Sequence, residues 1–217
     1  MYKLPLFPLN TVLFPGMPVR LHIFEERYKQ MMALCLQSRQ PFGVVLIREG
    51  VEANGPLAEP HMIGCTAHII QVEPLPMGRM NVTAVGQERF KILALNYDSA
   101  YLAAVVESCP LDNQTPFALR RVGQKLRPWV ERYLEMLTQA GNVEFDSSQL
   151  PADPVALAYL SAYLLQVPPH HKQELLAMDD APAFVQSVTK LCRREVLLLD
   201  SILKRVTAEE MRPFSVN

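Results

Sequence analysis

The sequence predicts an α+β protein, with a small mixed β-barrel in its N-terminal half and a helical subdomain in its C-terminal half. In the first half, short apolar segments with β-branched residues alternate with turn residues, as in sheet proteins. One early segment, from Phe24, has helical spacing, and this spacing returns from Pro116 onward. We therefore expect a barrel subdomain over residues 1–110 and a helical bundle over residues 116–210, joined by a linker at Cys109–Thr115.

The opening stretch, Leu4–Tyr28, is the segment on which the rest of the predicted barrel packs. Its prolines exclude a helix, because proline fixes φ and lacks an N–H donor. These prolines are Pro5, Pro8, Pro15 and Pro18. The apolar residues between them predict short strands, with a turn at Phe14-Pro15-Gly16. A buried helix face with spacings of three and four then follows and should end at Gln40-Pro41. Its members are Phe24, Tyr28, Met31, Met32, Cys35 and Leu36.

Further strands are predicted by apolar runs and by alternation of polar and apolar residues. They are Phe42–Ile47, Met62–Val72, Asn81–Val85, Glu88–Asn96 and Tyr101–Glu107. Turns are expected at Leu75–Arg79, which would close a hairpin, and at Tyr97–Ala100. Six or seven short strands favour a closed barrel, because closure removes exposed strand edges.

The second half of the chain is predicted to be helical. Thr115-Pro116 is a typical helix start, and the helix that follows should reach Gly141-Asn142, with a kink or a break into two helices near Leu126 because of Pro128. Two shorter helices are predicted at Pro154–Val167 and His170–Met178. A long amphipathic helix begins after Asp180, and we expect it to pack against the helix at 154–167 rather than to form a dimeric coiled coil.

Composition excludes several classes of protein. The net charge is −1 and the pI is near 6.5, so the whole chain has no electrostatic reason to bind nucleic acid or an anionic membrane. No apolar run approaches the roughly 20 residues that span a bilayer. The four cysteines are widely separated and lie in apolar runs, which favours reduced thiols and a cytoplasmic location.

The motifs of common enzymes are missing from the sequence. Gly50–Gly55 has the spacing of a phosphate loop, but Pro56-Leu57 stands where Lys and Ser/Thr are needed. Two S-x-x-K matches, at Ser187 and Ser201, lie within one amphipathic helix without the supporting signatures. His170 and His171 point in different directions on a helix. We predict no catalytic residue, no metal ligand and no cofactor.

One predicted helix is locally basic. It carries five cations against two carboxylates, a net charge of +3. The cations are Arg120, Arg121, Lys125, Arg127 and Arg132, and the carboxylates are Glu131 and Glu135. This helix is interpreted as a solvated surface, with nucleic-acid binding as the alternative.

Four residues are candidates for a functional surface: Phe24, Tyr28, Arg79 and Arg89. For each of them the alternative is a structural role. We also expect a buried ion pair between Glu25 and Arg89 that ties the first helix to the barrel.

The residues resemble the N-terminal substrate-binding domain of Lon, the ATP-dependent protease, from about Leu4 to Lys204. The matching segments are LPLFPLNTVLFPGMPVRLHIFEERY at the start, then Phe42–Val45, Ile63–Ala67, Gly86–Phe90 and Lys172–Leu176. The resemblance implies a PUA-like barrel, a helical subdomain and engagement of protein substrates. Full-length Lon continues into an ATPase with a phosphate loop and a Ser-Lys peptidase, and this chain ends first. We therefore expect no hydrolysis of ATP or peptides.

The function predicted from the sequence is a non-enzymatic, ATP-independent module that binds unfolded or extended polypeptides. An apolar groove between the barrel and the helices would be the binding surface. The alternatives are an RNA-binding PUA-like module and an enzyme with an unrecognised small-molecule pocket. The ligand, the oligomeric state and cooperation with a full-length Lon protease stay open at this stage.

Overall fold

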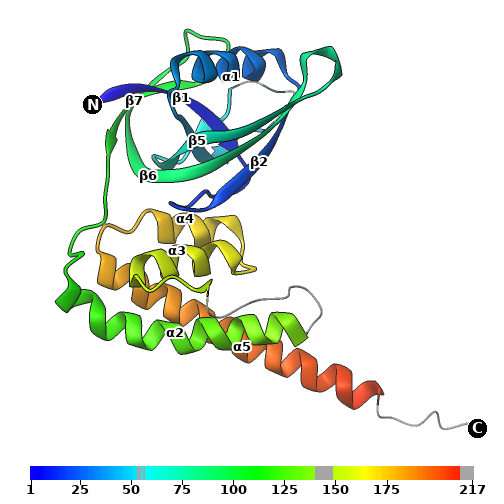
Figure 1. Ribbon diagram of the computed structural model, residues 1–217, viewed down its shortest axis with the longest axis vertical. Helices are drawn as coiled ribbons and strands as arrows, with labels where there is room; N and C mark the ends of the chain where they lie inside the picture. Colours follow the sequence, from blue (N-terminus) through cyan, green and yellow to red (C-terminus); the bar gives the residue numbers. More distant parts are fainter. Residues whose placement is uncertain (53–54, 56, 140–148, 211–217) are drawn as a thin grey trace, which may run out of the picture. The chain divides into compact units, whose positions relative to one another are not determined.

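The computed structural model describes the chain except residues 53–54, 56, 140–148 and 211–217 (Figure 1). It divides into two compact units, each made of two stretches of chain. Unit 1 contains residues 1–112 and 162–180, and unit 2 contains residues 113–161 and 181–217. The first change of unit falls between Asp112 and Asn113. In contrast to the linear division at 1–110 and 116–210, residues 162–180 belong with the sheet.

Unit 1 is built on a seven-stranded sheet. Its strands are β1 (Tyr2–Leu9), β2 (Pro18–Ile23), β3 (Phe42–Glu49), β4 (Glu59–Pro60), β5 (Ile63–Pro74), β6 (Met80–Asn96) and β7 (Ala103–Ser108). Strands β1, β7, β6, β5 and β3 are neighbours in that order, and a parallel pairing of β1 with β3 closes the ring. All other pairings are antiparallel. The α+β class and the barrel predicted from the sequence are therefore confirmed.

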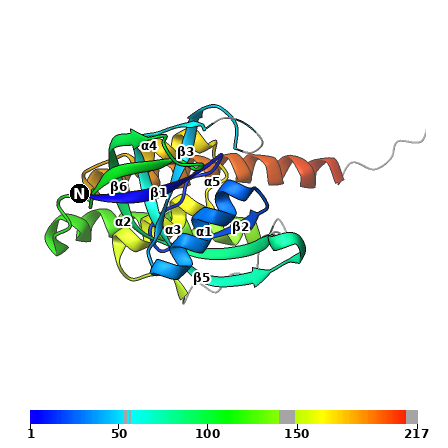
Figure 2. The same ribbon diagram turned by 90° about the horizontal axis from the view of Figure 1, so that it is seen from above.

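Helix α1 (Glu26–Ser38) covers one end of this barrel (Figures 1 and 2). Its buried face holds Tyr28, Met31, Met32 and Cys35, which pack on the interior side chains of the strands. The helix begins two residues later than its predicted apolar face, and Phe24 is 43% exposed. Arg39 ends the helix in the left-handed conformation, next to the predicted stop.

The two strands predicted at 81–85 and 88–96 form one long strand, β6. Its register against β5 shifts between the pair Cys65–Arg89 and the pair Ala67–Gly86, so a bulge occurs where the sequence suggested a gap. At this bulge the turn after β1 crosses the sheet: Gly16 N donates to Gly86 O (2.8 Å) and Gly86 N donates to Met17 O (2.9 Å). The opening stretch is thus fixed to the middle of β6.

Helix α4 (Pro169–Leu176) packs against the barrel within unit 1. The Gln173 side chain is buried and donates from Nε2 to the Ile63 carbonyl at 3.0 Å. The linker after β7 is held to the end of the same segment, because Asp112 N donates to Asp179 O at 2.7 Å. These bonds explain why residues 162–180 join the sheet.

Unit 2 contains α2 (Pro116–Gln139), the start of α3 (Pro154–Leu164) and α5 (Ala181–Glu210). Helix α2 continues through Pro128, so of the two predicted outcomes near Leu126, a kink or a break, the break into two helices does not occur. Buried residues on both sides of the proline, Leu126 and Val130, hold the helix together. The Gln124 carbonyl loses its helical hydrogen bond, because Pro128 has no N–H to donate to it. Gln124 is exposed to water.

Helix α5 packs on α2, a partner that the sequence did not predict. The Arg193 guanidinium lies 5.6 Å from the centre of the Trp129 ring. Contact with α3 is also present, since the rings of Tyr159 and Phe184 lie 4.9 Å apart. Within the described part of the chain, no helix is both long and apolar enough to cross a bilayer.

The four cysteines are free thiols, and we expect them to differ strongly in reactivity. Burial raises the pKa of Cys35 to about 11 and the pKa of Cys65 and Cys192 to about 12, so their thiolate fraction at pH 8 is very small. Cys109 is the one that is partly exposed. Iodoacetamide at that pH should alkylate Cys109 first and the other three after unfolding, as measured by peptide mass spectrometry. Equal labelling of Cys35 and Cys109 in the folded protein would contradict this prediction.

Candidate functional site

Strands β5 and β6 end in a tight turn at residues 75–79, the hairpin tip. Leu75 N donates to Arg79 O at 2.8 Å and closes the turn. Between them, Met77 and Gly78 both have positive φ, 61° and 67°. Glycine takes this conformation without strain, whereas methionine rarely does, and strained residues of this kind concentrate at functional sites.

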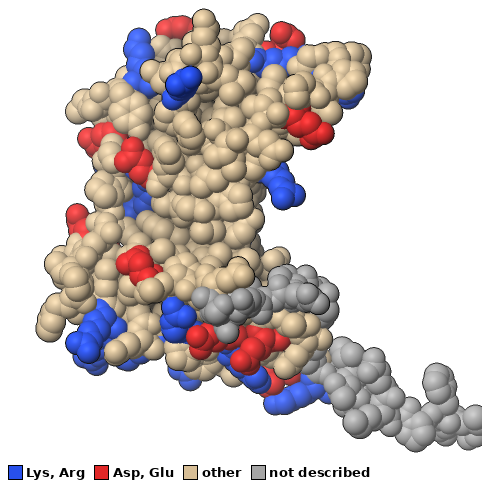
Figure 3. Space-filling view, in the orientation of Figure 1, with Lys and Arg blue, Asp and Glu red and all other residues tan. Residues whose placement is uncertain are grey.

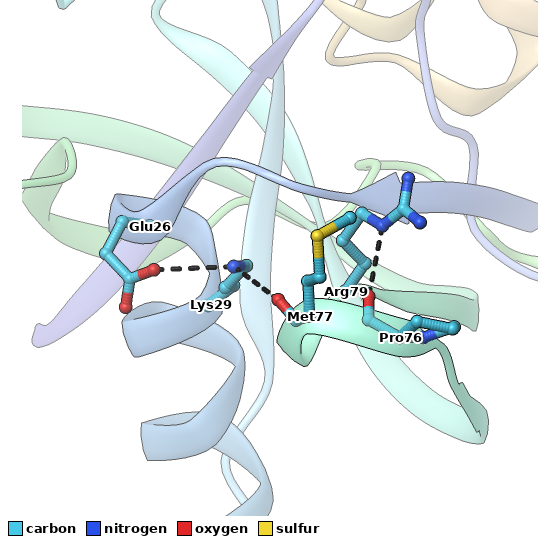
Figure 4. Close-up of polar contacts among 5 residues, drawn as sticks. All are labelled: Glu26, Lys29, Pro76, Met77 and Arg79. Atoms are coloured by element: carbon cyan, nitrogen blue, oxygen red, sulfur yellow. Dashed lines mark hydrogen bonds and ion pairs between the residues drawn. The ribbon is translucent and has the colours of Figure 1, made fainter.

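Helix α1 braces the hairpin tip from the side (Figure 4). Lys29 Nζ donates to the Met77 carbonyl at 3.1 Å and forms an ion pair with Glu26 at 3.4 Å. Arg79 folds back within the turn, and its Nε donates to Pro76 O at 3.1 Å. The carbonyl groups of the strained turn are thus occupied by two cationic side chains, and the Met77 side chain is left at the surface.

Two large apolar side chains are exposed at this end of unit 1. Met77 is 78% exposed and Phe24 is 43% exposed. The register pairs Ile23 with Met80, so the next residues along the two strands, Phe24 and Arg79, lie beside each other at the tip. We call Phe24, Glu26, Lys29, Met77 and Arg79 the tip patch. It combines a flexible thioether, an aromatic ring and charges of both signs.

Polar side chains hold the three strands together below the tip patch. Asn81 on β6 donates from Nδ2 to Glu73 on β5 at 3.0 Å. Its amide oxygen therefore accepts from Nδ1 of His22 on β2, at 2.8 Å. The His22 ring stacks on Phe24 with centroids 5.9 Å apart, so this chain of bonds also fixes the position of the exposed aromatic ring.

The structure brings together two of the four predicted site residues, Phe24 and Arg79. Tyr28 is 5% exposed and stacks on Phe7 with centroids 4.2 Å apart. Burial raises its pKa, and Arg27 lies over the ring at 4.7 Å. Arg89 is also buried, on another part of β6. A binding role for these residues stays a prediction.

The predicted ion pair between Glu25 and Arg89 is wrong. Glu25 pairs with its neighbour Arg27 at 2.9 Å. Arg89 Nη2 instead contacts Asp179 Oδ1 at 3.3 Å and Cys109 Sγ at 3.6 Å. Arg89 therefore ties the segment after α4 to the barrel, and not the first helix.

A second concave surface lies at the other end of α1. It has a volume of about 340 Å³, with an apolar floor formed by Leu4, Leu34 and Cys35 and a polar rim that includes Asn96 and Asp98. The two rim residues bond to each other, with Asn96 Nδ2 donating to Asp98 at 3.0 Å. Among the described residues, no group of three or more His, Cys, Asp or Glu side chains could hold a metal ion.

Sequence reasoning missed Met77 and Lys29. The sequence predicts a turn at Leu75–Arg79, but methionine is usually a core residue, so its side chain is not expected at the surface. The sequence signal that could have found Met77 is its place between Pro76 and Gly78, because the residues of a turn lie beyond the paired strands.

Comparison of this chain with known proteins identifies its family. Residues 3–194 match the family model described as "ATP-dependent protease La (LON) substrate-binding domain". The Lon protease of Paraburkholderia phytofirmans is 28% identical over 201 residues, and that of Anaeromyxobacter dehalogenans is 27% identical over 217 residues. These alignments cover 91% and 96% of this chain but 23% and 25% of the two proteases. The chain thus spans about a quarter of the length of these relatives.

Solved structures show the same fold. A Lon N-terminal domain protein from Xanthomonas campestris aligns with a TM-score of 0.65 at 24% identity, covering 87% of this chain and 97% of that chain. The N-terminal domain of Lon protease from the Mycobacterium avium complex aligns with a TM-score of 0.65 at 20% identity, covering 88% and 98%. From the family match over residues 3–194, this chain belongs to the family of Lon substrate-binding domains.

Proposed function

We propose that this protein binds unfolded or extended polypeptides at the tip patch, without ATP and without catalysing a reaction. The observation that carries the proposal is the pair of exposed apolar side chains, Met77 and Phe24, on a strained and braced turn. The family is described by substrate binding, and the substrates of its proteases are polypeptides. The free thiols support a reducing compartment, and we place the protein in the cytoplasm.

The chemistry of the tip patch suits segments of varied sequence. Methionine is unbranched and polarisable, so Met77 can adapt to different apolar side chains. Phe24 offers a ring whose position His22 fixes, which lowers the conformational entropy lost on binding. Glu26, Lys29 and Arg79 surround them with donors and acceptors for an extended backbone.

The test is the affinity of the full chain for a labelled, permanently unfolded polypeptide, measured by fluorescence anisotropy. Replacing the two exposed apolar residues, Met77→Asp and Phe24→Asp, should each weaken binding about tenfold or more, as expected for exposed residues that become buried in an interface. Added salt should change the wild-type affinity little, because the contact is mainly apolar.

Met62→Asp is the matched control. Met62 is a methionine of the same unit and is 47% exposed, but it lies at the opposite end of β5 from the tip. This variant should bind as tightly as the wild type. Equal losses in Met62→Asp and Met77→Asp, or no loss in either tip variant, would rule out the tip patch as the binding surface.

A further inference from the structure

The N-terminal half of α2, in unit 2, carries exposed side chains that packing does not explain. Phe117 is 95% exposed, in the first turn of the helix. Arg120, Arg121 and Lys125 are exposed as well, and none of them forms an ion pair with a residue that the structure describes. No Asp or Glu occurs in the sequence from Pro116 to Pro128. All charged residues in this half of the helix are therefore cations.

Helix stability does not account for these charges. The helix dipole does not stabilise Arg120, Arg121 or Lys125, because it favours cations only in the last turn of a helix. The two cations farther along the helix do have partners: Arg127 pairs with Glu131 at 3.6 Å and Arg132 with Glu135 at 3.1 Å. Residues that break a local rule without a compensating contact are expected at functional sites.

The exposed residues lie on neighbouring positions of the helix surface beside a hollow. Phe117, Arg120, Arg121 and Gln124 follow helical spacings of three and four. Arg120 and Gln124 line a hollow of about 410 Å³, together with Pro128, Pro154 and Leu157. Figure 3 shows Lys and Arg side chains gathered over the N-terminal part of α2.

We propose that this face of α2 binds single-stranded nucleic acid. The three unpaired cations would neutralise successive phosphates, and the Phe117 ring would stack on a base. The hollow, which the ion pair of Arg127 and Glu131 also lines, offers space for a second base, and the Arg120 guanidinium and the Gln124 amide are further hydrogen-bonding groups in its lining. An acidic polypeptide would satisfy the cations but would leave the exposed ring without a stacking partner.

The experiment measures binding of labelled single-stranded RNA and of DNA of the same sequence to the full chain over a range of salt concentrations. The logarithm of the affinity should fall with the logarithm of salt with a slope of about −2, since each of three contacts on a single strand contributes about −0.7. The triple variant R120Q/R121Q/K125Q should lose this salt dependence. Phe117→Ala should weaken binding about fivefold or more. Preference for either RNA or DNA agrees with the proposal.

Matched controls remove the same charge elsewhere in unit 2. The triple variant R132Q/R194Q/K204Q removes three cations that are each paired with a carboxylate, and Leu197→Ala removes a side chain that is 58% exposed on α5. Both should bind like the wild type, as should Met77→Asp. No binding at low salt, equal losses in test and control triples, or competition by polyglutamate as strong as by RNA would overturn the proposal. None of these results affects polypeptide binding at the tip patch.

Discussion

Replacing Gly86 with alanine is expected to lower the free energy of unfolding by more than about 3 kcal/mol, measured by urea denaturation. A Cβ atom at this position would overlap the carbonyl oxygen of Phe14 and lie 3.1 Å from Cys65 Sγ. The backbone has little freedom to move away, because Gly86 exchanges two hydrogen bonds with the turn at Gly16-Met17. The substitution forces that turn off the sheet, and the opening strands with it.

Gly78→Ala is the control, because it replaces a glycine at a position where an added Cβ atom meets no backbone atom. Gly78 has a φ of +67°, but the nearest atom to an added Cβ is the end of the Lys29 side chain, at 3.8 Å. This variant should therefore cost only the strain of the left-handed backbone, about 1 kcal/mol. If Gly86→Ala were no more destabilising than Gly78→Ala, the close approach of Phe14 to β6 would not limit stability.

The sequence predicts the sheet and the helices well because their periodicities differ and each is visible within a few residues. The strand at Phe42 and the helix start at Pro116 follow from such local patterns. Local patterns do not report partners that are distant in the chain. Arg89 meets Asp179, 90 residues later, through a segment that returns to the barrel. The wrong pairing with Glu25 reflects this limit, because the sequence pattern does not show that the segment after α4 returns to β6.

The candidate site is predicted only in part for a related reason. Phe24 has the spacing of the buried helix face, yet the helix begins at Glu26 and the ring remains at the surface. Met77 lies between Pro76 and Gly78 in the predicted turn, but methionine as a residue type is more often found in a core. Its exposure depends on the positive φ of the turn, which no side-chain periodicity records. Arg79 lies in the turn that the sequence predicts, and its function stays a prediction.

Arg89→Ala is expected to lower the free energy of unfolding by about 3 kcal/mol, whereas Arg89→Met should stay within about 1 kcal/mol of the wild type. The Arg89 side chain is 1% exposed, and its Nε and Nη1 atoms have no hydrogen-bond partner among the described residues. Burying a charge that is only partly bonded is costly. Alanine leaves a cavity under the segment after α4, while methionine fills most of the volume without a charge.

Double-mutant cycles then separate the two ion-pair assignments. Arg89 and Asp179 are in contact, so the combined loss in Arg89→Ala/Asp179→Ala should differ from the sum of the single losses by more than about 0.5 kcal/mol. Arg89→Ala and Glu25→Ala should be additive within that limit, because Glu25 pairs with Arg27. A coupling to Glu25, or an Arg89→Met protein as unstable as Arg89→Ala, would show that the buried guanidinium stabilises the barrel through its charge and not through its volume.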